Sequence, residues 1–275
     1  MARTYHQLRA DLLKALAVFL DAEEAQAETM RWFEDGLGLS RSWMVLHGGE
    51  EAPSAIQAQV ETWLERRRQG EPWAYLLGWS LWRERRFEVT PATLIPRPET
   101  ELVLEAALDL GRRLKVDRVV DVGTGSGILG ITLALETSWA VTATDLSPEA
   151  LAVARRNAQS LGADLSFVQG HLLDPVPGPL GLVVSNPPYV DPADAPSLQR
   201  ELAWEPPSAL FAEERGLALS LELLRQARHR AAPACVLEIG AGQGEPLTAH
   251  AQAMGWKRVQ VHQDLAGHDR VLMVM

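Results

Sequence analysis

The sequence has one cysteine, no hydrophobic run long enough to cross a membrane, and fewer basic than acidic residues. The single cysteine, Cys235, cannot form a disulfide within the chain. It lies in the apolar run 235–237, where we expect it to pack as a small hydrophobic side chain. The first residues lack the apolar core of a signal peptide. These features predict a cytoplasmic protein that makes no membrane contact.

The small number of basic residues is relevant to whether the protein binds nucleic acid. Lys and Arg number 26 against 36 Asp and Glu, which gives a formal net charge of −10. The acidic excess is present both before and after residue 99. Because nucleic-acid binding depends on Lys and Arg that neutralise phosphates, this balance argues against a direct nucleic-acid partner. The 275 residues are 47% hydrophobic, which suits a folded protein with a full core.

The first part of the chain is predicted to be helical. Leucines recur at helical spacing over residues 5–20, and a further amphipathic helix is expected from Pro53 to Gly70. Six of the nine tryptophans precede residue 83. We expect most of them in the core, although an aromatic-rich domain also suits protein docking. We therefore predict a helical, substrate-docking domain over residues 1–78.

Short alternating runs and prolines follow this helical part. Residues 80–89 read as a β-hairpin, and the prolines of 94–98 stiffen the next segment. We predict a hairpin linker over residues 79–98 with a second domain over 99–275.

From about residue 117 the chain alternates strand and helix patterns, which predicts a mostly parallel sheet with helices on both faces. The last two strands are close enough in sequence to pair antiparallel at the sheet edge. The predicted fold class is therefore α/β, with a Rossmann-like sheet of seven strands. The expected strands are 118–122, 141–145, 165–169, 182–184, 235–239, 259–262 and 271–274.

One of these strands ends in a chemically unusual segment. The apolar run 182–184 must stop at Asn186, because Pro187 and Pro188 donate no ladder hydrogen bonds and fix φ. Asn186 carries an amide, the prolines leave rigid carbonyls, and Tyr189 adds a flat face with a polar tip. These groups suit a planar NH2 group, which would donate to the Asn186 oxygen and the Pro187 carbonyl and stack on Tyr189.

A glycine segment two strands earlier predicts a cofactor site. The strand ending in Asp121 and Val122 is followed by Gly123-Thr124-Gly125-Ser126-Gly127 at the start of a helix. Asp145 ends the next strand and can hold ribose hydroxyls. Nicotinamide enzymes use a related glycine pattern, but carboxylates at Asp121, Asp145 and Asp174 suit a cationic ligand better than a pyrophosphate.

A second glycine segment, 240–244, is an alternative cofactor site, because it also follows a strand and precedes Asp264 by a spacing similar to that between 123–127 and Asp145. It has no counterpart of the Asn186–Tyr189 segment after it. We therefore assign the cofactor to 123–127 and interpret 240–244 as a turn.

Together these residues resemble the class I, Rossmann-like S-adenosylmethionine methyltransferases that act on amide or exocyclic amino nitrogens. Four further motifs extend the resemblance, over nearly the whole chain, to the release-factor glutamine methyltransferases of the HemK/PrmC family. They are Tyr75-x-x-Gly78, Leu94-Ile95-Pro96-Arg97-Pro98-Glu99-Thr100-Glu101, Trp204-Glu205-Pro206 and Asp264-Leu265-Ala266-Gly267-His268-Asp269-Arg270.

The resemblance implies methylation of the glutamine side-chain amide (N5) in the Gly-Gly-Gln motif of class I peptide release factors. It implies S-adenosylmethionine as cofactor, with S-adenosylhomocysteine as product. Cofactor contacts are implied for Gly123, Thr124, Gly125, Ser126, Gly127, Asp145, Asn186 and Leu172, which falls where family members often carry a bulky aromatic. The substrate amide is expected on Asn186, Pro187, Pro188 and Tyr189, with Asn186, Pro187 and Tyr189 as catalytic residues and no metal.

Several alternatives remain open at this level. The acceptor could be a ribosomal-protein glutamine, or an exocyclic amino group of adenine or guanine in nucleic acid. A nicotinamide oxidoreductase or a non-catalytic binding module would leave Asn186–Tyr189 unexplained. His171 is a possible general base, although a single histidine in a loop is more often a solvated bystander. We expect a monomer.

Overall fold

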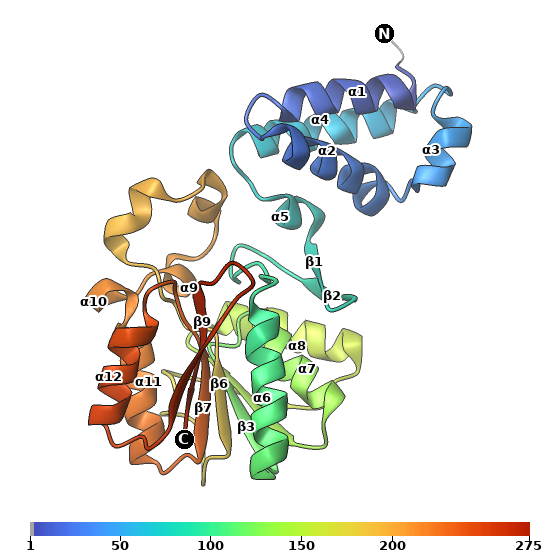
Figure 1. Ribbon diagram of the computed structural model, residues 1–275. Helices are drawn as coiled ribbons and strands as arrows, with labels where there is room; N and C mark the ends of the chain where they lie inside the picture. Colours follow the sequence, from blue (N-terminus) through green and yellow to red (C-terminus); the bar gives the residue numbers. More distant parts are fainter. Residues whose placement is uncertain (1–2) are drawn as a thin grey trace. The chain divides into compact units, whose positions relative to one another are not determined.

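The computed structural model describes residues 3–275, which divide into two compact units, one ending at Gly78 and the other beginning at Trp79. The first unit is helical. Its helices are α1 (Tyr5–Leu16), α2 (Ala22–Arg31), α3 (Arg41–His47), α4 (Ser54–Arg68) and α5 (Trp73–Leu77), and a π-helical turn, Trp32–Gly36, extends α2 (Figure 1).

Tryptophans form the centre of the first unit. Trp32 stacks on Trp73 with ring centroids 4.8 Å apart, and Trp63 meets both rings edge-on. A buried ion pair lies beside them, in which Arg67 Nε donates to Glu28 Oε1 at 2.8 Å. The prediction that most of the early tryptophans are core residues is confirmed for Trp32, Trp63, Trp73 and Trp82.

The second unit begins with a two-stranded antiparallel hairpin, β1 (Trp79–Trp82) and β2 (Arg85–Glu88). Its main sheet has seven strands, the predicted number, and they lie in the order β5-β4-β3-β6-β7-β9-β8. These strands are β3 (Arg118–Val122), β4 (Ala140–Asp145), β5 (Ser166–Gln169), β6 (Leu182–Ser185), β7 (Ala234–Glu238), β8 (Val259–Gln263) and β9 (Asp269–Val274).

Strands β3 to β7 run parallel, and β9 pairs antiparallel with both β7 and β8, which confirms the expected edge. Longer helices cover both faces of the sheet: α6, α7 and α8 on one side, α11 and α12 on the other (Figure 1). Their bounds are α6 (Thr100–Leu114), α7 (Ile128–Glu136), α8 (Pro148–Leu161), α11 (Ala218–His229) and α12 (Gly244–Ala253).

Successive side chains of each strand point to opposite faces of the sheet, so the core has two layers. Val119, Leu182 and Val184 pack toward α6 and α7, whereas Val120 and Val183 pack toward α11. Cys235 in β7 belongs to the second layer, and its thiol is fully buried, which raises its pKa. The single cysteine is thus a core residue, as its sequence context predicts.

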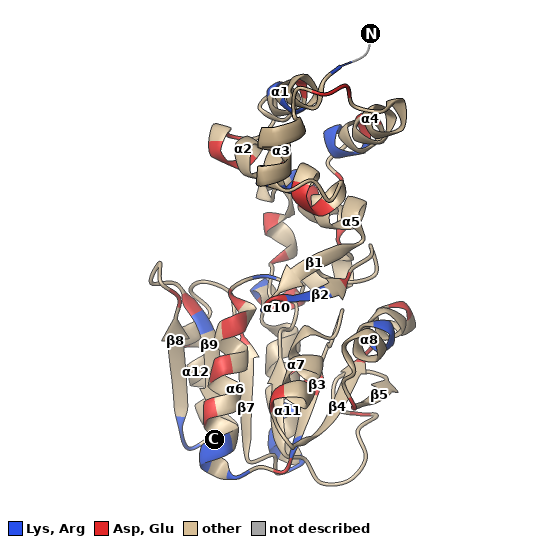
Figure 2. Cartoon of the chain, turned by 90° about the vertical axis from the view of Figure 1, so that its right-hand side faces the viewer, with Lys and Arg blue, Asp and Glu red and all other residues tan. Residues whose placement is uncertain are grey.

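Helix α6 carries Glu101, Glu105 and Asp109 along its length and Arg112 and Arg113 in its last turn (Figure 2). This distribution matches the helix dipole, because cations are favoured near a helix carboxyl end.

The segment after β6 is irregular. It contains two 3-10 turns, Pro192–Ser197 and Arg200–Trp204, and two short helices, α9 (Pro207–Leu210) and α10 (Glu213–Gly216). Val190 N donates to Leu210 O at 2.9 Å, and Ala212 N donates to Val190 O at 3.0 Å, so the segment folds back on the chain that follows Tyr189. Among residues 3–275, no helix is both long and apolar enough to span a bilayer.

Candidate functional site

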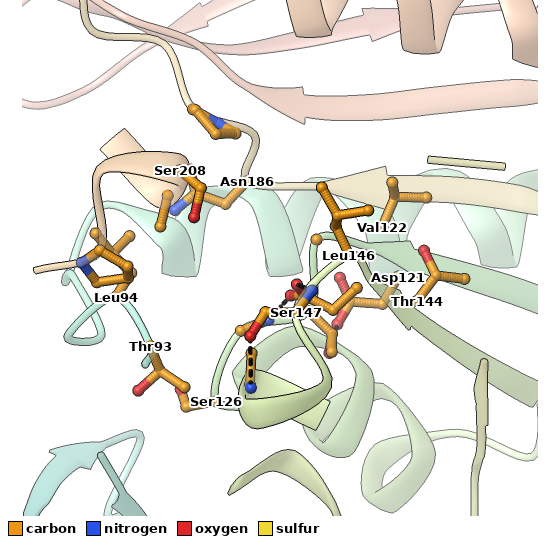
Figure 3. Close-up of a pocket in the computed structure, with 18 of the residues that line it drawn as sticks. Thr93, Leu94, Asp121, Val122, Ser126, Thr144, Leu146, Ser147, Asn186 and Ser208 are labelled. Atoms are coloured by element: carbon orange, nitrogen blue, oxygen red, sulfur yellow. Dashed lines mark hydrogen bonds between the residues drawn. The ribbon is translucent and has the colours of Figure 1, made fainter. Parts of the chain in front are cut away.

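A cavity of about 340 Å³ lies in the second unit, where β3, β4 and β6 end. Strand order reverses here, because β4 and β5 continue to one side of β3 while β6 lies on the other. Such a switch point of a parallel sheet is where ligands bind in doubly wound folds. Figure 3 shows Asp121 and Val122 from β3, Thr144 from β4 and Asn186 after β6 around this space.

The first glycine segment forms one wall of the cavity. Gly125 has φ +56°, and a Cβ added there would meet no atom within 4 Å, so its bare backbone borders open space. Gly127 differs, because an added Cβ would lie 2.5 Å from Ile131 Cδ1. Gly123, Thr124 and Ser126 line the cavity as well, whereas Gly127 lies outside its lining and lets α7 pack closely.

Asp121 is a buried carboxylate beneath the glycine segment. Its Oδ2 accepts hydrogen bonds from Thr124 Oγ1 at 2.6 Å and Gly130 N at 2.8 Å, while Oδ1 has no partner in the described part of the chain. Burial raises the pKa of Asp121 from 3.8 to about 6, against the lowering effect of these bonds. An unpartnered carboxylate oxygen beside a cavity suits a ligand that carries a donor or a positive charge.

Asp145 organises the glycine segment from the neighbouring strand. Its Oδ2 accepts a hydrogen bond from Gly125 N at 2.9 Å, and its Oδ1 accepts one from Ser147 N at 2.9 Å. Burial raises the pKa of this carboxyl, and the backbone bonds oppose the shift. Both oxygens retain a lone pair for a ligand, so the ribose contact expected for Asp145 stays a prediction.

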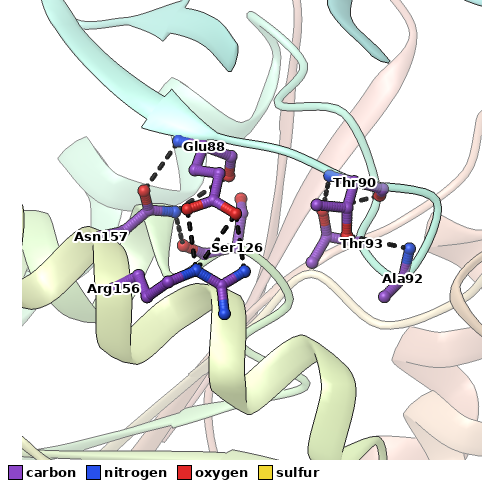
Figure 4. Close-up of polar contacts among 7 residues, drawn as sticks. All are labelled: Glu88, Thr90, Ala92, Thr93, Ser126, Arg156 and Asn157. Atoms are coloured by element: carbon purple, nitrogen blue, oxygen red, sulfur yellow. Dashed lines mark hydrogen bonds and ion pairs between the residues drawn. The ribbon is translucent and has the colours of Figure 1, made fainter. Parts of the chain in front are cut away.

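The buried side chain of Asn157, in α8, also holds the glycine segment in place. Its Nδ2 donates to Ser126 O at 2.8 Å and Glu88 O at 3.0 Å, and its Oδ1 accepts a hydrogen bond from Glu88 N at 2.7 Å. Arg156 pairs with the Glu88 carboxylate on the exposed side (Figure 4). One amide thus joins the hairpin strand β2 to the cavity wall.

Asn186 presents an unpartnered acceptor at the cavity. Its Nδ2 donates to Thr100 Oγ1 at 3.1 Å, at the first turn of α6. Its Oδ1 is buried and has no hydrogen-bond partner within residues 3–275. Because buried amide oxygens are normally paired, this atom is suited to accept a hydrogen bond from a bound ligand.

The residues after Asn186 are placed differently from one another. Pro188 lines the cavity, whereas the buried Pro187 and the half-buried Tyr189 are not part of its lining. The Tyr189 hydroxyl donates to Glu238 Oε1 at 3.1 Å, and burial raises its pKa further above the usual value. The hydroxyl is therefore a permanent donor, and the stacking expected for Tyr189 stays a prediction.

Three other residues considered in the sequence lie near or outside the cavity. Leu172 lines it with a left-handed backbone, φ +47°, and its carbonyl accepts from Thr144 Oγ1 at 3.1 Å. His171 also lines it but is solvent-exposed, with Nδ1 3.8 Å from Asp174 Oδ2. Asp174 is exposed and is not a lining residue.

The proline-rich 94–98 segment is held by a buried glutamate. Glu205 Oε2 accepts a hydrogen bond from Ile95 N at 2.9 Å, and its Oε1 pairs with the Arg97 guanidinium. Burial raises the pKa of Glu205, and Arg97 lowers it. This links two of the motifs noted in the sequence and keeps Arg97 at the cavity.

Sequence reasoning missed the role of Glu238 and Thr100. Both side chains are fully buried, and Thr100 Oγ1 donates to Glu238 Oε2 at 2.7 Å. The sequence feature that could have revealed Glu238 is its position as a charged residue at the end of the apolar strand 234–238. The second glycine segment, which follows Glu238, forms a turn that leads into α12 and does not line the cavity.

No group of three or more His, Cys, Asp or Glu residues is placed to hold a metal ion in the portion from residue 3 to 275. The polar side chains that line the cavity carry amide, hydroxyl and carboxylate groups, together with the Arg97 guanidinium and the His171 imidazole.

The chain is similar to known methyltransferases. A Methyltransferase small domain profile matches residues 100–213, and a PrmC N-terminal domain profile matches residues 11–78. The chain is 39% identical to the Release factor glutamine methyltransferase of Deinococcus radiodurans over 269 residues, 96% of each protein. It is 40% identical to the protein of the same name from Bordetella pertussis over 243 residues, 86% of this chain and 90% of that one.

Among solved structures, the hMettl16 catalytic domain in complex with MAT2A 3′UTR hairpin 6 matches with a TM-score of 0.58. It covers 82% of this chain and 84% of that one at 16% identity, so this likeness shows the fold alone. The relatives found by sequence cover most of the chain, and the family assignment depends on them. The chain belongs to the release factor glutamine methyltransferase family.

Proposed function

We propose that the protein transfers a methyl group from S-adenosylmethionine to the side-chain amide nitrogen (N5) of the glutamine in the Gly-Gly-Gln motif of class I peptide release factors. The relatives named release factor glutamine methyltransferases support the substrate and the reaction. The observation that carries the proposal at the site is the buried, unpartnered Asn186 Oδ1 at the cavity.

The walls of the cavity suit S-adenosylmethionine in their chemistry. The open backbone at Gly123 and Gly125 allows close approach, and Asp145 offers free lone pairs for the ribose hydroxyls. The unpartnered Asp121 Oδ1 suits a cationic group. Thr124, Ser126, Leu172 and Asn186 complete the proposed contacts. Bound here, the cofactor supplies an electrophilic methyl group.

The protein contributes positioning and electrostatics. An amide nitrogen is a poor nucleophile because its lone pair is delocalised into the carbonyl. Asn186 Oδ1 accepts one N–H of the substrate glutamine and the Pro187 carbonyl accepts the other, which orients the NH2 plane in the site. Both acceptors also favour the positive charge that develops on nitrogen during transfer.

The proton leaves the substrate nitrogen late, to water or to the groups that hold the amide. Tyr189 is protonated and donates to Glu238, so it is not a base in this arrangement. His171, the candidate base considered from the sequence, lines the cavity but is exposed to solvent.

The first unit takes part in the proposal as the part that docks the release factor. The match of residues 11–78 to a PrmC N-terminal domain supports this role, as do Val45 and Leu46 of α3, which are 79% and 78% exposed. Exposed aliphatic side chains of this kind suit protein contact.

The proposal is tested by mass spectrometry of an unmethylated release factor incubated with the protein and S-adenosylmethionine. We expect one methyl group on the motif glutamine and none on a control in which that glutamine is replaced by glutamate. Asn186→Ala should lower turnover roughly 10²- to 10³-fold at saturating cofactor while S-adenosylhomocysteine still binds.

Turnover by Asn186→Ala close to that of the wild type would contradict the role of Asn186. An unmodified release factor, with cofactor binding intact, would contradict the substrate assignment. Ribosomal-protein glutamines would then be tested first, followed by the exocyclic amines of nucleic acids.

A further inference from the structure

Three polar residues from distant parts of the second unit form a hydrogen-bonded chain that ends at the cavity. Glu238 lies at the end of β7, Thr100 begins α6, and Asn186 follows β6. Thr100 Oγ1 lies 2.7 Å from Glu238 Oε2 and 3.1 Å from Asn186 Nδ2. Glu238 and Thr100 are fully buried, so water does not compete for these bonds.

The chemistry of each group fixes the direction of every bond in this chain. Glu238 receives two donors, Thr100 Oγ1 on Oε2 and Tyr189 OH at 3.1 Å on Oε1. Burial raises the pKa of Glu238, whereas these two hydrogen bonds and Arg270 lower it. In the ionised form that these donors stabilise, the carboxylate can only accept. A hydroxyl has a single proton, and the Thr100 hydroxyl uses it in the hydrogen bond that it donates to Glu238 Oε2. Toward Asn186, the Thr100 oxygen can therefore only accept.

Asn186 must then turn its NH2 group to Thr100, which leaves Oδ1 at the cavity without a partner among the residues described. If the amide were reversed, two oxygens would face each other and an NH2 group would point at the ligand. Such a site would suit a carboxylate and would leave the N–H bonds of a glutamine without an acceptor.

We propose that Glu238 and Thr100 are positioning residues that fix the orientation of the Asn186 amide, so that the site selects a glutamine amide over a glutamate carboxylate. This inference rests on the proposed function and extends it from the reaction to its specificity. Thr100 also lines the cavity. In this scheme its hydroxyl is engaged with Glu238 and Asn186, so both positioning residues act through Asn186.

Thr100→Val tests the chain with little change in volume, because it replaces only the hydroxyl that joins Glu238 to Asn186. Thr100→Ser keeps the hydroxyl and should restore the wild-type behaviour. Thr132→Val in α7 is the matched control, because Thr132 is also fully buried and its Oγ1 has no partner within the described residues 3–275. It should be neutral.

The orientation of the amide can be followed in the full-length protein without substrate. The sequence contains only two asparagines, Asn157 and Asn186, so labelling with ¹⁵N-asparagine gives two side-chain NH2 signals in an NMR spectrum. Thr100→Val should abolish the protection of the Asn186 NH2 protons from exchange. Asn157, with three hydrogen bonds of its own, should stay protected in every variant.

Kinetics then test specificity. Thr100→Val should lower kcat/KM for the glutamine-containing release factor about 10- to 100-fold, mainly through kcat. It should also strengthen inhibition by the glutamate-containing release factor about tenfold, because a freed amide can offer its NH2 group. Glu238→Gln has one acceptor oxygen where the carboxylate has two, and it should shift the inhibition in the same direction.

The proposal is overturned if Thr100→Val keeps the Asn186 NH2 protected, or if it loses activity without changing the preference for glutamine over glutamate. Loss of activity in Thr100→Ser would also contradict it, since that variant retains the hydroxyl. A wild-type protein that fails to methylate the release factor would contradict the proposed function instead, and the NMR result would still decide whether Thr100 orients Asn186.

Discussion

Asp121 is a residue whose charge opposes folding. Its folded pKa of about 6 lies above the usual 3.8, because burial penalises the ionised form. Between these two values the folded chain holds a proton that the unfolded chain has released. Lowering the pH through this window therefore stabilises the fold at this site, and above it the buried charge carries its full cost.

Asp121→Asn should remove this cost. We expect its free energy of unfolding at pH 7.5 to exceed that of the wild type by on the order of 1–3 kcal/mol, with a smaller difference at pH 5. Urea unfolding at the two pH values measures both. Asp117→Asn, four residues earlier and exposed, should keep the wild-type pH dependence. An Asp121→Asn protein less stable than the wild type at pH 7.5 would contradict this account.

Single residues differ in how far the sequence reveals them. Asn186 and the glycines 123–127 lie in short motifs, and the sequence alone directs attention to them. The bond between Thr100 and Glu238 spans 138 residues of sequence, and that between Asn186 and Thr100 spans 86. No local pattern encodes such pairs, because they exist only once the sheet brings its strand ends together.

At the scale of elements, the hairpin β1–β2 depends on α8. Asn157 saturates both backbone groups of Glu88 and also holds Ser126 O in the cavity wall (Figure 4). This arrangement couples the position of β2 to the shape of the glycine segment.

Asn157→Ala should leave these three backbone groups without their partner. We expect a loss of about 2–4 kcal/mol in the free energy of unfolding, and weaker S-adenosylhomocysteine binding because the Ser126 carbonyl is released. Urea unfolding and calorimetric titration measure the two effects. The control is Arg156→Ala, which removes an exposed ion pair to the same Glu88 and should cost about 0–1 kcal/mol. Equal costs for the two variants would contradict the special role of Asn157.

Elements with apolar runs and clear ends were predictable. The strand 182–185 stops before Asn186-Pro187-Pro188, and β3, β4 and β7 begin and end within one residue of their predicted bounds. The turns and short helices over 192–216 were not predicted, because this segment lacks apolar periodicity. Its course depends instead on contacts between distant residues, such as Val190 with Leu210 and Ala212.

At the scale of the whole molecule, each unit has its own hydrophobic core. The first is built on the tryptophan cluster, and the second on the two layers that cover the sheet. All the residues that line the cavity fall between 92 and 219, within the second unit. Cofactor binding should therefore depend on the second unit alone.

A fragment of residues 79–275 should fold and bind S-adenosylhomocysteine within about threefold of the affinity of the full chain, since the cavity lining is complete in it. Its methylation of a release factor should fall much further if the first unit docks the substrate. Circular dichroism, calorimetry and the mass-spectrometric assay measure these three properties. A folded fragment that does not bind the ligand would contradict the assignment of the cavity.

Because Cys235 is buried at the centre of the sheet, the reactivity of the only thiol of the chain reports how often the sheet opens. Its strand is flanked by β6 on one side and β9 on the other, so a reagent reaches the sulfur only when the sheet opens. At a concentration of alkylating agent high enough for modification to outpace reclosing, the rate of modification of Cys235 equals the rate at which the sheet opens. Since this needs neither engineered labels nor purified material, the lifetime of the fold could be timed in a cell extract beside the release factors themselves.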